Sequence, residues 1–371
     1  MTRAVVARFT LVLGGLLVGL LGAEGVARVV RPAGHADLLF DSPEASPRDL
    51  YVIDPELVLV PRPGFEDTIR TQDYEVPLAF DAEGVRVPPG SPAASGGRES
   101  WIAAGDSFTL AVQVPLAETF AARVSARLGV PVHNLGVDGY STWQASRRAA
   151  RLSREREVTG VLLTFFLGND LQDNERFPHI LRTVEGRPAG AAIPRPPVPL
   201  WQSVLLRTSA VYAHLRVWYR ARTLRAGTDP ARQRWQEELA IFSEDGAQAL
   251  GRLLPATRRA LAEARRETQQ RGQRLVVALA PPAFVVHPER LASTFEVVGL
   301  DPARARPDAP RDALVHELEG LDIASCDLTP ALRTASASGE RLYFTYDGHW
   351  TDAGHAVVAE AMADCIEETA P

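Results

Sequence analysis

The sequence predicts an α/β protein whose main domain is built on a five-stranded parallel sheet. From residue 100 onward, short apolar runs alternate with helical patterns. The composition, 46% apolar and 23% charged residues in a chain of 371, is that of a globular protein with a sizeable core. Strands that alternate with helices form parallel sheets, because parallel neighbours need a crossover connection. Helices then cover both faces, so we expect a three-layer α/β/α arrangement.

The expected elements follow in chain order. The sequence predicts strands over residues 100–105, 131–135, 160–167, 274–282 and 321–328, and helices over residues 115–128, 142–156 and 352–367. A long helical insertion, about 171–273, separates the third and fourth strands and includes a polar helix around 230–270. The insertion also contains an aromatic stretch with Trp201, Tyr212, Trp218 and Tyr219. Helical core packing is the favoured interpretation of these aromatic residues, and a substrate-facing lid is the alternative.

The N-terminus predicts a membrane segment. Residues 9–23 carry no charge, follow Arg3 and Arg8, and are ended by Glu24. This length lies between a signal-peptide core and a full membrane span. We expect an uncleaved signal anchor, a transmembrane helix over residues 1–31, because the cleavage pattern at Gly25-Val26-Ala27 is weak. The alternative is a cleaved signal and a secreted protein. In both cases the remaining chain lies outside the cytoplasm.

Three parts of the chain are expected. Residues 1–31 form the anchor, 32–98 a small β-rich extension and linker, and 99–371 the main domain. The middle part carries many prolines and short alternating runs such as YEVPLAFDAEGVRV, which are typical of β-hairpins. Its last residues, PPGSPAASGGRES, have the composition of a loop.

Charge and cysteine content exclude several classes of function. The formal net charge of −6 provides no basic surface for nucleic acid. The two cysteines, Cys326 and Cys365, form no Cys-x-x-Cys motif, so we expect no structural metal and no cofactor. They are either two separate buried thiols or one disulfide. The sequence does not predict the oligomeric state.

Polar residues follow several of the predicted strands. Gly105-Asp106-Ser107 follows the first strand, NLGVDGYST (134–142) the second, and Gly168-Asn169-Asp170 the third, while YDGHWTDAGH (346–355) precedes the last helix. Ligands of open parallel sheets bind outside the carboxyl ends of the strands. We therefore expect these four segments to meet at one edge of the sheet.

Together these residue types are suited to acyl chemistry. A serine is a poor nucleophile until a base takes its proton. His349 can act as that base for Ser107, while Asp347 orients the imidazole and stabilises its charged form. The oxyanion that forms during attack on an ester needs preorganised donors. The Ser107 N–H, the Gly139 N–H and the side-chain amide of Asn169 are the candidates.

The same four segments resemble the sequence blocks of the SGNH hydrolases, also called GDSL esterases, over about residues 100–371. The N-terminal extension is similar to that of larger membrane-anchored bacterial members. The resemblance implies a flavodoxin-like SGNH fold, Ser107 as nucleophile, Gly139 and Asn169 in the oxyanion hole, and Asp347 and His349 completing the triad. One departure is Asp347-Gly348-His349-Trp350 in place of the usual Asp-x-x-His. This shorter form resembles polysaccharide O-acetyltransferases of the same fold, in which the pair commonly precedes the serine block.

The expected function is therefore a serine esterase. It would cleave an acyl ester, above all an O-acetyl ester, of a carbohydrate or small molecule in the periplasm, with the chain held in the cell membrane by one helix. A polysaccharide O-acetyltransferase is the first alternative. An inactive, membrane-tethered binding or assembly protein is the alternative from another class, and the complete set of Ser, Gly, Asn, Asp and His argues against it.

Overall fold

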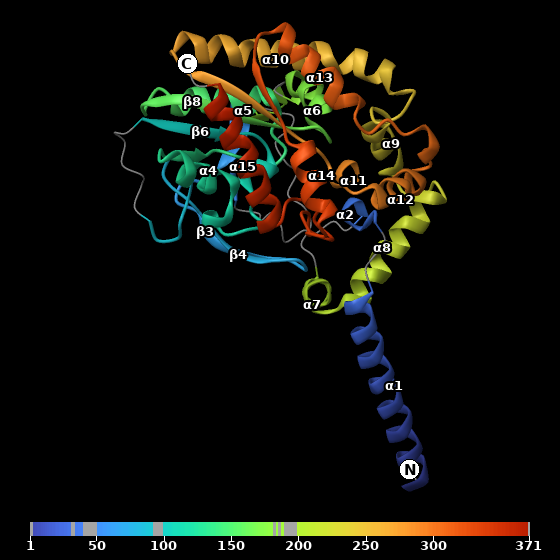
Figure 1. The fold of residues 1–371 in the computed structure, drawn as a ribbon. Helices are drawn as coiled ribbons and strands as arrows, with labels where there is room; N and C mark the ends of the chain where they lie inside the picture. The colour runs from blue at the N-terminus through green and yellow to red at the C-terminus, as the bar shows by residue number, and fades with distance from the viewer. Residues whose placement is uncertain are drawn as a thin grey trace.

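The structure is a computed structural model that describes residues 3–30, 34–39, 50–91, 99–180, 183–184, 187–188 and 199–369. It begins with one long helix, α1 (Arg3–Val29), which projects from the globular part of the molecule (Figure 1). The stretch Val5–Val29 of this helix is long and apolar enough to cross a membrane, and its apolar side chains are exposed. At 1.5 Å per residue these 25 residues extend about 38 Å, more than the roughly 30 Å of a bilayer's hydrocarbon core. The N-terminal segment is thus a membrane anchor or a signal sequence.

The predicted five-stranded parallel sheet is confirmed. Its strands are β6 (Ser100–Ala104), β7 (Val132–Asn134), β8 (Val158–Phe166), β11 (Arg274–Ala280) and β12 (Ala324–Asp327). They lie in the order β12-β11-β8-β6-β7, and every neighbouring pair is parallel. Counted along the sheet in chain order, this is the flavodoxin-like order 2-1-3-4-5. The chain reverses its direction of winding at β6, so the carboxyl end of β6 lies at the switch point, where such sheets bind ligands.

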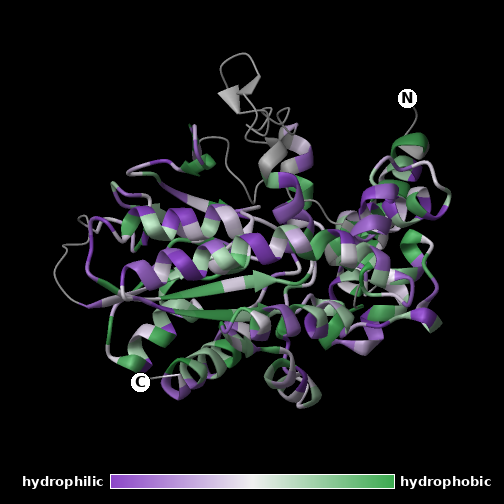
Figure 2. Ribbon diagram, turned by 90° about the horizontal axis from the view of Figure 1, so that it is seen from above, coloured by the Kyte–Doolittle hydropathy of each residue, from purple (hydrophilic) through white to green (hydrophobic). Residues whose placement is uncertain are grey.

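Helices cover both faces of the sheet, as the three-layer prediction requires (Figure 2). One face is covered by α4 (Phe120–Leu128), α14 (Thr329–Ala337) and α15 (Asp352–Glu368), and the other by α5 (Thr142–Leu152), α6 (Asp170–Ile180), α10 (Gly246–Gln270) and α13 (Ala309–Gly320). Alternate residues of β6 enter the two cores: Trp101 and Ala103 pack with the first group, Ile102 and Ala104 with the second. The strands are therefore apolar on both sides, which explains their continuous apolar runs.

The N-terminal strands form two small antiparallel sheets. These contain β1 (Tyr51–Asp54) with β2 (Val58–Pro61), and β3 (Glu66–Arg70) with β4 (Glu75–Phe80) and β5 (Arg86–Val87). The second sheet shares a hydrophobic cluster with the segment that follows β6, including Leu110 and Val112. Arg86 is buried there, and its guanidinium donates hydrogen bonds to the carbonyl oxygens of Leu110 (2.7 Å), Ala111 (2.6 Å) and Val114 (2.7 Å). The β-rich part thus packs directly on the main domain.

The remaining elements connect these layers. They are α2 (Ala36–Leu39), α3 (Ser107–Leu110), the 3₁₀ turn η2 (Leu116–Glu118), β9 (Thr183–Val184), β10 (Arg187–Pro188), α7 (Leu200–Thr208), α8 (Ala210–Arg225), α9 (Arg232–Ala240), α11 (Ala283–Val286), α12 (Pro288–Val298) and the 3₁₀ turn η3 (Pro302–Arg304).

Two helix predictions need correction. The helix expected over 115–128 is divided at Thr119, whose side chain accepts a hydrogen bond from the Ala122 N–H and so starts α4 anew. The single polar helix expected around 230–270 is two helices, α9 and α10. The chain turns sharply between them, and a Cβ on Gly246 would lie only 2.6 Å from the Ala240 carbonyl oxygen. Ile241 and Phe242 lie between the two helices and are buried. Because both are apolar, the sequence shows no break between the helices at this point.

The favoured interpretation of the aromatic stretch was wrong for three of its four members. The side chains of Trp201, Trp218 and Tyr219 are 61%, 59% and 62% exposed, so they are not core residues. Only Tyr212 is partly buried against the core. The buried face of α8 is instead formed by small and aliphatic residues: Ala210, Ala213, Val217, Ala221 and Leu224.

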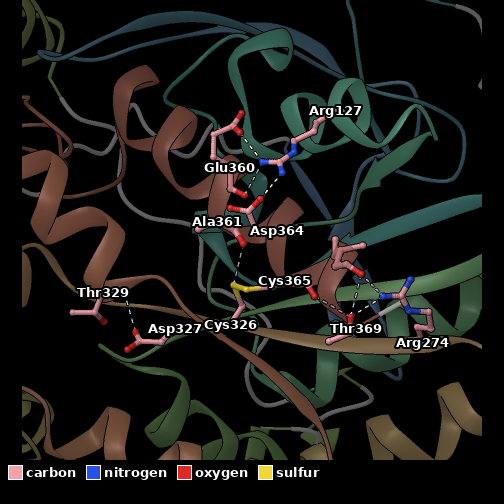
Figure 3. The surroundings of a disulfide bond; sticks show 11 residues. Arg127, Arg274, Cys326, Asp327, Thr329, Glu360, Ala361, Asp364, Cys365 and Thr369 are labelled. Atoms are coloured by element: carbon pink, nitrogen blue, oxygen red, sulfur yellow. Dashed lines mark hydrogen bonds and ion pairs between the residues drawn. A yellow bond between two sulfur atoms is a disulfide. The ribbon is translucent and has the colours of Figure 1, made fainter. Parts of the chain in front are cut away.

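Cys326 and Cys365 form a disulfide between β12 and α15 (Figure 3). Of the two possibilities that the sequence left open, the structure therefore has the bridge. The Cα atoms are 5.9 Å apart, within the usual range for a disulfide, and 39 positions separate the two residues along the chain. Nearby, Arg127 of α4 forms ion pairs with Glu360 (2.6 Å) and with Asp364, both on α15. The last helix is thus fixed both to the sheet and to its neighbour.

The disulfide can be tested by counting thiols. We expect the purified, unreduced protein to show no reactive thiol in denaturant and two after reduction. The chain-entropy model gives a bridge of this loop length about 4 kcal/mol, so Cys326→Ser with Cys365→Ser is expected to unfold at clearly lower denaturant concentration. Two free thiols in the unreduced, unfolded protein would show that the bridge does not form.

Candidate active site

Ser107 lies at the turn between β6 and α3. In the run from Trp101 to Leu110 it alone is half-buried, while its neighbours are buried. Asp106 stands before it as the N-cap of α3, and its carboxylate accepts a hydrogen bond from the Phe108 N–H (2.9 Å). This backbone contact shapes the turn at the start of α3. The Ser107 hydroxyl is consequently presented at the carboxyl end of β6 on a fixed turn.

The tightness of this turn explains the glycine before it. A Cβ on Gly105 would lie 2.3 Å from Thr109 Oγ1 and 2.9 Å from the carbonyl oxygen of Thr164 in β8. Only glycine therefore allows β6 to end so close to β8.

Asp347 and His349 lie on a short loop before α15. The loop is closed by a hydrogen bond from the Phe344 N–H to the His349 carbonyl (2.9 Å). Gly348 has φ +80°, a left-handed conformation that other residues adopt only with strain. This reversal allows the acid and the histidine to face each other with only one residue between them. Thr351 caps α15 by accepting a hydrogen bond from the Gly354 N–H (3.2 Å).

The structure brings Ser107, His349 and Asp347 into one chain of hydrogen bonds. His349 Nε2 lies 2.7 Å from Ser107 Oγ, and His349 Nδ1 contacts Asp347 Oδ1. The two ring nitrogens therefore have different partners. This geometry fits a neutral ring that carries its proton on Nδ1 and accepts the serine proton at Nε2.

The electrostatics of the pair favour a charged imidazole. Burial by itself lowers the pKa of His349, but the Asp347 carboxylate outweighs burial and raises this pKa to about 8. Burial raises the pKa of Asp347, yet the imidazolium and further hydrogen bonds hold that pKa below its usual value. The site thus stabilises the proton that a serine would give up.

Aromatic rings hold the imidazole in place. The ring of Phe108 lies 4.6 Å from that of His349, 4.8 Å from that of Trp350 and 4.2 Å from that of Phe166, measured between centroids. Trp350 is fully buried. The residues that follow the serine and the histidine in the sequence therefore pack against each other.

A second histidine close to this loop, His355, is a packed residue. It is buried in α15, where its Nδ1 accepts a hydrogen bond from the Phe120 N–H (3.3 Å). Burial lowers the pKa of His355 to about 3, so its ring is neutral at physiological pH.

The N-terminal strands supply contacts that the sequence analysis missed. At the tip of the β3–β4 hairpin, Tyr74 Oη donates a hydrogen bond to Asp347 Oδ2 (2.8 Å). Asp73 Oδ2 accepts hydrogen bonds from the N–H groups of Tyr346 (2.8 Å) and Asp347 (3.1 Å). Gln113 Nε2 donates to Asp347 Oδ1 (3.1 Å). In the sequence, Asp73 and Tyr74 show only the signal of a hairpin tip, and residues 74 and 347 are 273 positions apart.

Gly139 and Asn169 lie on either side of Ser107, because β7 and β8 are the two neighbours of β6. Gly139, with φ +69°, belongs to the loop after β7, and this loop is joined to the end of β6 by a bond from the Val137 N–H to the Gly105 carbonyl (3.2 Å). Asn169 lies in the turn after β8, three residues beyond Phe166. Its buried Oδ1 has no hydrogen-bond partner within the described residues. The oxyanion role of both residues stays a prediction.

Comparison with known proteins places part of this chain in a family. Residues 241–371 match the family described as "SGNH hydrolase-like domain, acetyltransferase AlgX". The matched segment contains Asp347 and His349. It begins at residue 241 and therefore does not include Ser107. No curated protein matches the sequence.

Several solved structures are similar at low sequence identity. A lipolytic protein of the G-D-S-L family from Desulfitobacterium hafniense DCB-2 has a TM-score of 0.37 at 11% identity, over 72% of this chain and 99% of its own. The acetylxylan esterase Axe2 from Geobacillus stearothermophilus, solved as a catalytic mutant, has 0.37 at 13%, over 73% and 95%. A lipase/acylhydrolase from Enterococcus faecalis has 0.36 at 13%, over 73% and 96%.

The family match falls on the half of the domain that carries the histidine loop. The rest of the domain completes the sheet in 2-1-3-4-5 order and brings a Gly-Asp-Ser turn to within hydrogen-bond distance of that histidine. On this evidence residues 241–371 carry an SGNH hydrolase-like domain match, and the rest of the domain has the sheet order and the serine turn that the resemblance implies.

Proposed function

We propose that this protein is a serine enzyme that removes an acyl group, in the first instance acetyl, from an ester outside the cytoplasm. One observation carries the proposal. Ser107, His349 and Asp347 form a continuous hydrogen-bonded chain at the sheet edge where this fold binds ligands. Ser107 is the proposed nucleophile, His349 the base and Asp347 the residue that orients it.

In the first step, Ser107 Oγ attacks the ester carbonyl carbon while its proton passes to His349 Nε2. The negative charge that develops on the carbonyl oxygen needs donors fixed in advance, and the Ser107 N–H, the Gly139 N–H and the Asn169 amide are proposed for this role. The ester C–O bond then breaks, His349 returns the proton to the leaving alkoxide, and the acyl group remains on Ser107.

In the second step, a hydroxyl compound attacks the acyl-serine with His349 again as base. If the hydroxyl compound is water, the products are a free carboxylic acid and the regenerated serine. We propose hydrolysis as the outcome, because the serine block precedes the Asp/His pair in this chain, as it does in the esterases that it resembles.

Transfer to a sugar hydroxyl is the second candidate. The matched family is described as an acetyltransferase, and the match includes the loop with the short Asp347-Gly348-His349-Trp350 motif. The first step is the same in both cases. The two candidates differ only in the acceptor that reaches the acyl-serine.

We also propose that α1 stays in the cell membrane and that the domain lies in the periplasm. The helix is long enough to span a bilayer and has arginines at its N-terminal side. The Cys326–Cys365 bridge supports this location, since disulfides persist in oxidising compartments such as the periplasm.

The nucleophile is tested by Ser107→Ala. We expect turnover of short acyl esters to fall by several orders of magnitude with no loss of stability, because the hydroxyl serves chemistry rather than packing. A fluorophosphonate probe should label the wild type and fail to label the variant. The matched control is Ser146→Ala on α5, whose hydroxyl bonds the Thr142 carbonyl (2.8 Å). An unlabelled, inactive wild type would instead favour a binding or assembly protein.

The contact from Tyr74 makes a separate test of the base. Tyr74 donates a hydrogen bond to Asp347 Oδ2, and His349 contacts Asp347 Oδ1. Both groups therefore stabilise the negative charge of the same carboxylate. In Tyr74→Phe the ring can still pack against Phe344, 5.4 Å away between centroids, and only the hydroxyl is lost.

His349 must be neutral to accept a proton, so we expect kcat/KM to rise with pH through about 8, the raised pKa of His349. Without the Tyr74 hydroxyl, Asp347 attracts the imidazolium more strongly, so the rise should move to higher pH. Loss of one hydrogen bond to a charged group should lower kcat about tenfold. The control is Tyr343→Phe, which loses a hydroxyl that bonds the Pro281 carbonyl instead (2.8 Å). A wild-type pH profile in Tyr74→Phe would mean that Tyr74 is only structural.

The fate of the acyl group is tested by supplying an acetyl donor with and without acceptor oligosaccharides. We expect acetate to form in both cases and to remain the main product, as measured by mass spectrometry. Acetylated sugar that forms faster than acetate would establish transfer and overturn hydrolysis.

A further inference from the structure

Helices α7 and α8 carry a surface that the proposed chemistry does not use. Among the described residues outside 3–30, six large apolar side chains are well exposed, and five of them lie on these two helices: Trp201, Val204, Leu215, Trp218 and Tyr219. On α8 the spacing 215, 218, 219 places three of them on one face. The opposite face of α8 is buried and packs against the core. The exposed apolar residues therefore form a separate surface that faces solvent.

The same surface is basic although the protein is acidic. Residues 200–228 contain five arginines and no aspartate or glutamate, in a chain of net charge −6. Arg222 and Arg225 are exposed on α8, and the Arg222 guanidinium lies 5.8 Å from the centroid of the Trp218 ring. Tryptophan and tyrosine beside arginine are typical of helices that lie in the interfacial region of a bilayer.

This surface is attached to the membrane helix. The carboxylate of Glu24 in α1 accepts hydrogen bonds from Ser209 Oγ (2.9 Å), the Ala210 N–H (2.8 Å) and the Val211 N–H (3.2 Å). Glu24 thereby caps the start of α8. Glu24 is also the residue that ends the uncharged run 9–23.

Two further contacts fix the same junction. Arg28 donates to the Thr208 carbonyl (3.0 Å), and the Nε2 atom of His214 lies 3.0 Å from the Ala27 carbonyl oxygen. Figure 1 shows α7 and the start of α8 at the level where α1 meets the globular part. The exposed aromatic residues of α7 and α8 therefore lie next to the C-terminal end of the apolar stretch in α1.

We propose that α7 and the exposed face of α8 lie on the bilayer that α1 spans, in contact with the headgroups of anionic phospholipids. The arginines then face phosphates, and the tryptophan and tyrosine rings lie at the level of the headgroups. This inference rests on the proposed membrane anchoring. It adds a second contact, which fixes how the catalytic domain is turned relative to the membrane.

The experiment uses the full-length protein in vesicles. Both native cysteines are in a disulfide, so a fluorophore such as NBD can be attached to one new cysteine in Trp218→Cys. The matched control is Arg259→Cys, an exposed position on α10, which lies at the far end of the globular part from α1 (Figure 1). Vesicles are made of phosphatidylethanolamine with phosphatidylglycerol or of phosphatidylcholine alone, each with and without spin-labelled lipid as quencher.

With anionic lipid, we expect blue-shifted emission at residue 218 and quenching at least about twofold greater than at residue 259. In phosphatidylcholine, and in the variant that adds Arg222→Glu and Arg225→Glu, quenching at 218 should fall while turnover of a soluble ester stays unchanged. Equal quenching in neutral and anionic vesicles would overturn the role of anionic headgroups.

Flotation of the same vesicles separates this inference from the anchoring on which it rests. Protein that floats with an intact N-terminus but remains unquenched at residue 218 overturns the surface alone, and a protein partner is then the better occupant. Protein that does not float, or has lost α1, overturns both.

Discussion

The hydrogen bond between His349 Nε2 and Ser107 Oγ joins two segments that are 242 positions apart in the chain. Such a bond contributes only about 1 kcal/mol by itself, so it cannot hold the segments together. Their placement is imposed by the layers around them. The end of β6 is fixed by its two neighbouring strands, and the histidine loop is fixed by the start of α15 and the rings around Phe108. Ser107 Oγ and His349 Nε2 meet because both segments are anchored independently.

A third segment completes this arrangement. The β3–β4 hairpin reaches the backbone and the carboxylate of Asp347, so the carboxylate that contacts His349 is itself held from the N-terminal part of the chain. Tyr74 at the hairpin tip is buried and Asp73 is half-buried, and burial raises the pKa of Asp73 to about 6. The orientation of the His349 ring therefore depends on residues from three distant parts of the sequence.

Features that depend on a local residue pattern, such as the strands of the sheet, could be predicted from the sequence. Contacts between residues far apart in the chain could not. Strands such as β8 are buried on both faces, so their apolar runs were plain, and polar residues directly after them marked the carboxyl edge. Tyr74 could not be found in this way, because its partner is fixed only by tertiary packing. Trp218 and Tyr219 were interpreted as core residues, since large aromatic residues at helical spacing usually are. On α8 the core face is made of smaller residues, and the large rings point outward.

The three hydrogen bonds from Arg86 have a consequence for how this protein can be divided. They join the N-terminal strands to the segment just after Ser107, through the carbonyl oxygens of Leu110, Ala111 and Val114. If the strands were removed, these carbonyls would lose the hydrogen bonds from the Arg86 guanidinium, and the hydrophobic cluster around Leu78 and Val112 would be opened to water. A unit exchanged between proteins by recombination or engineering would therefore have to begin no later than about residue 50. The loop-like composition near residue 98 marks a boundary in the sequence, but the Arg86 hydrogen bonds and the shared hydrophobic cluster connect the two sides of it.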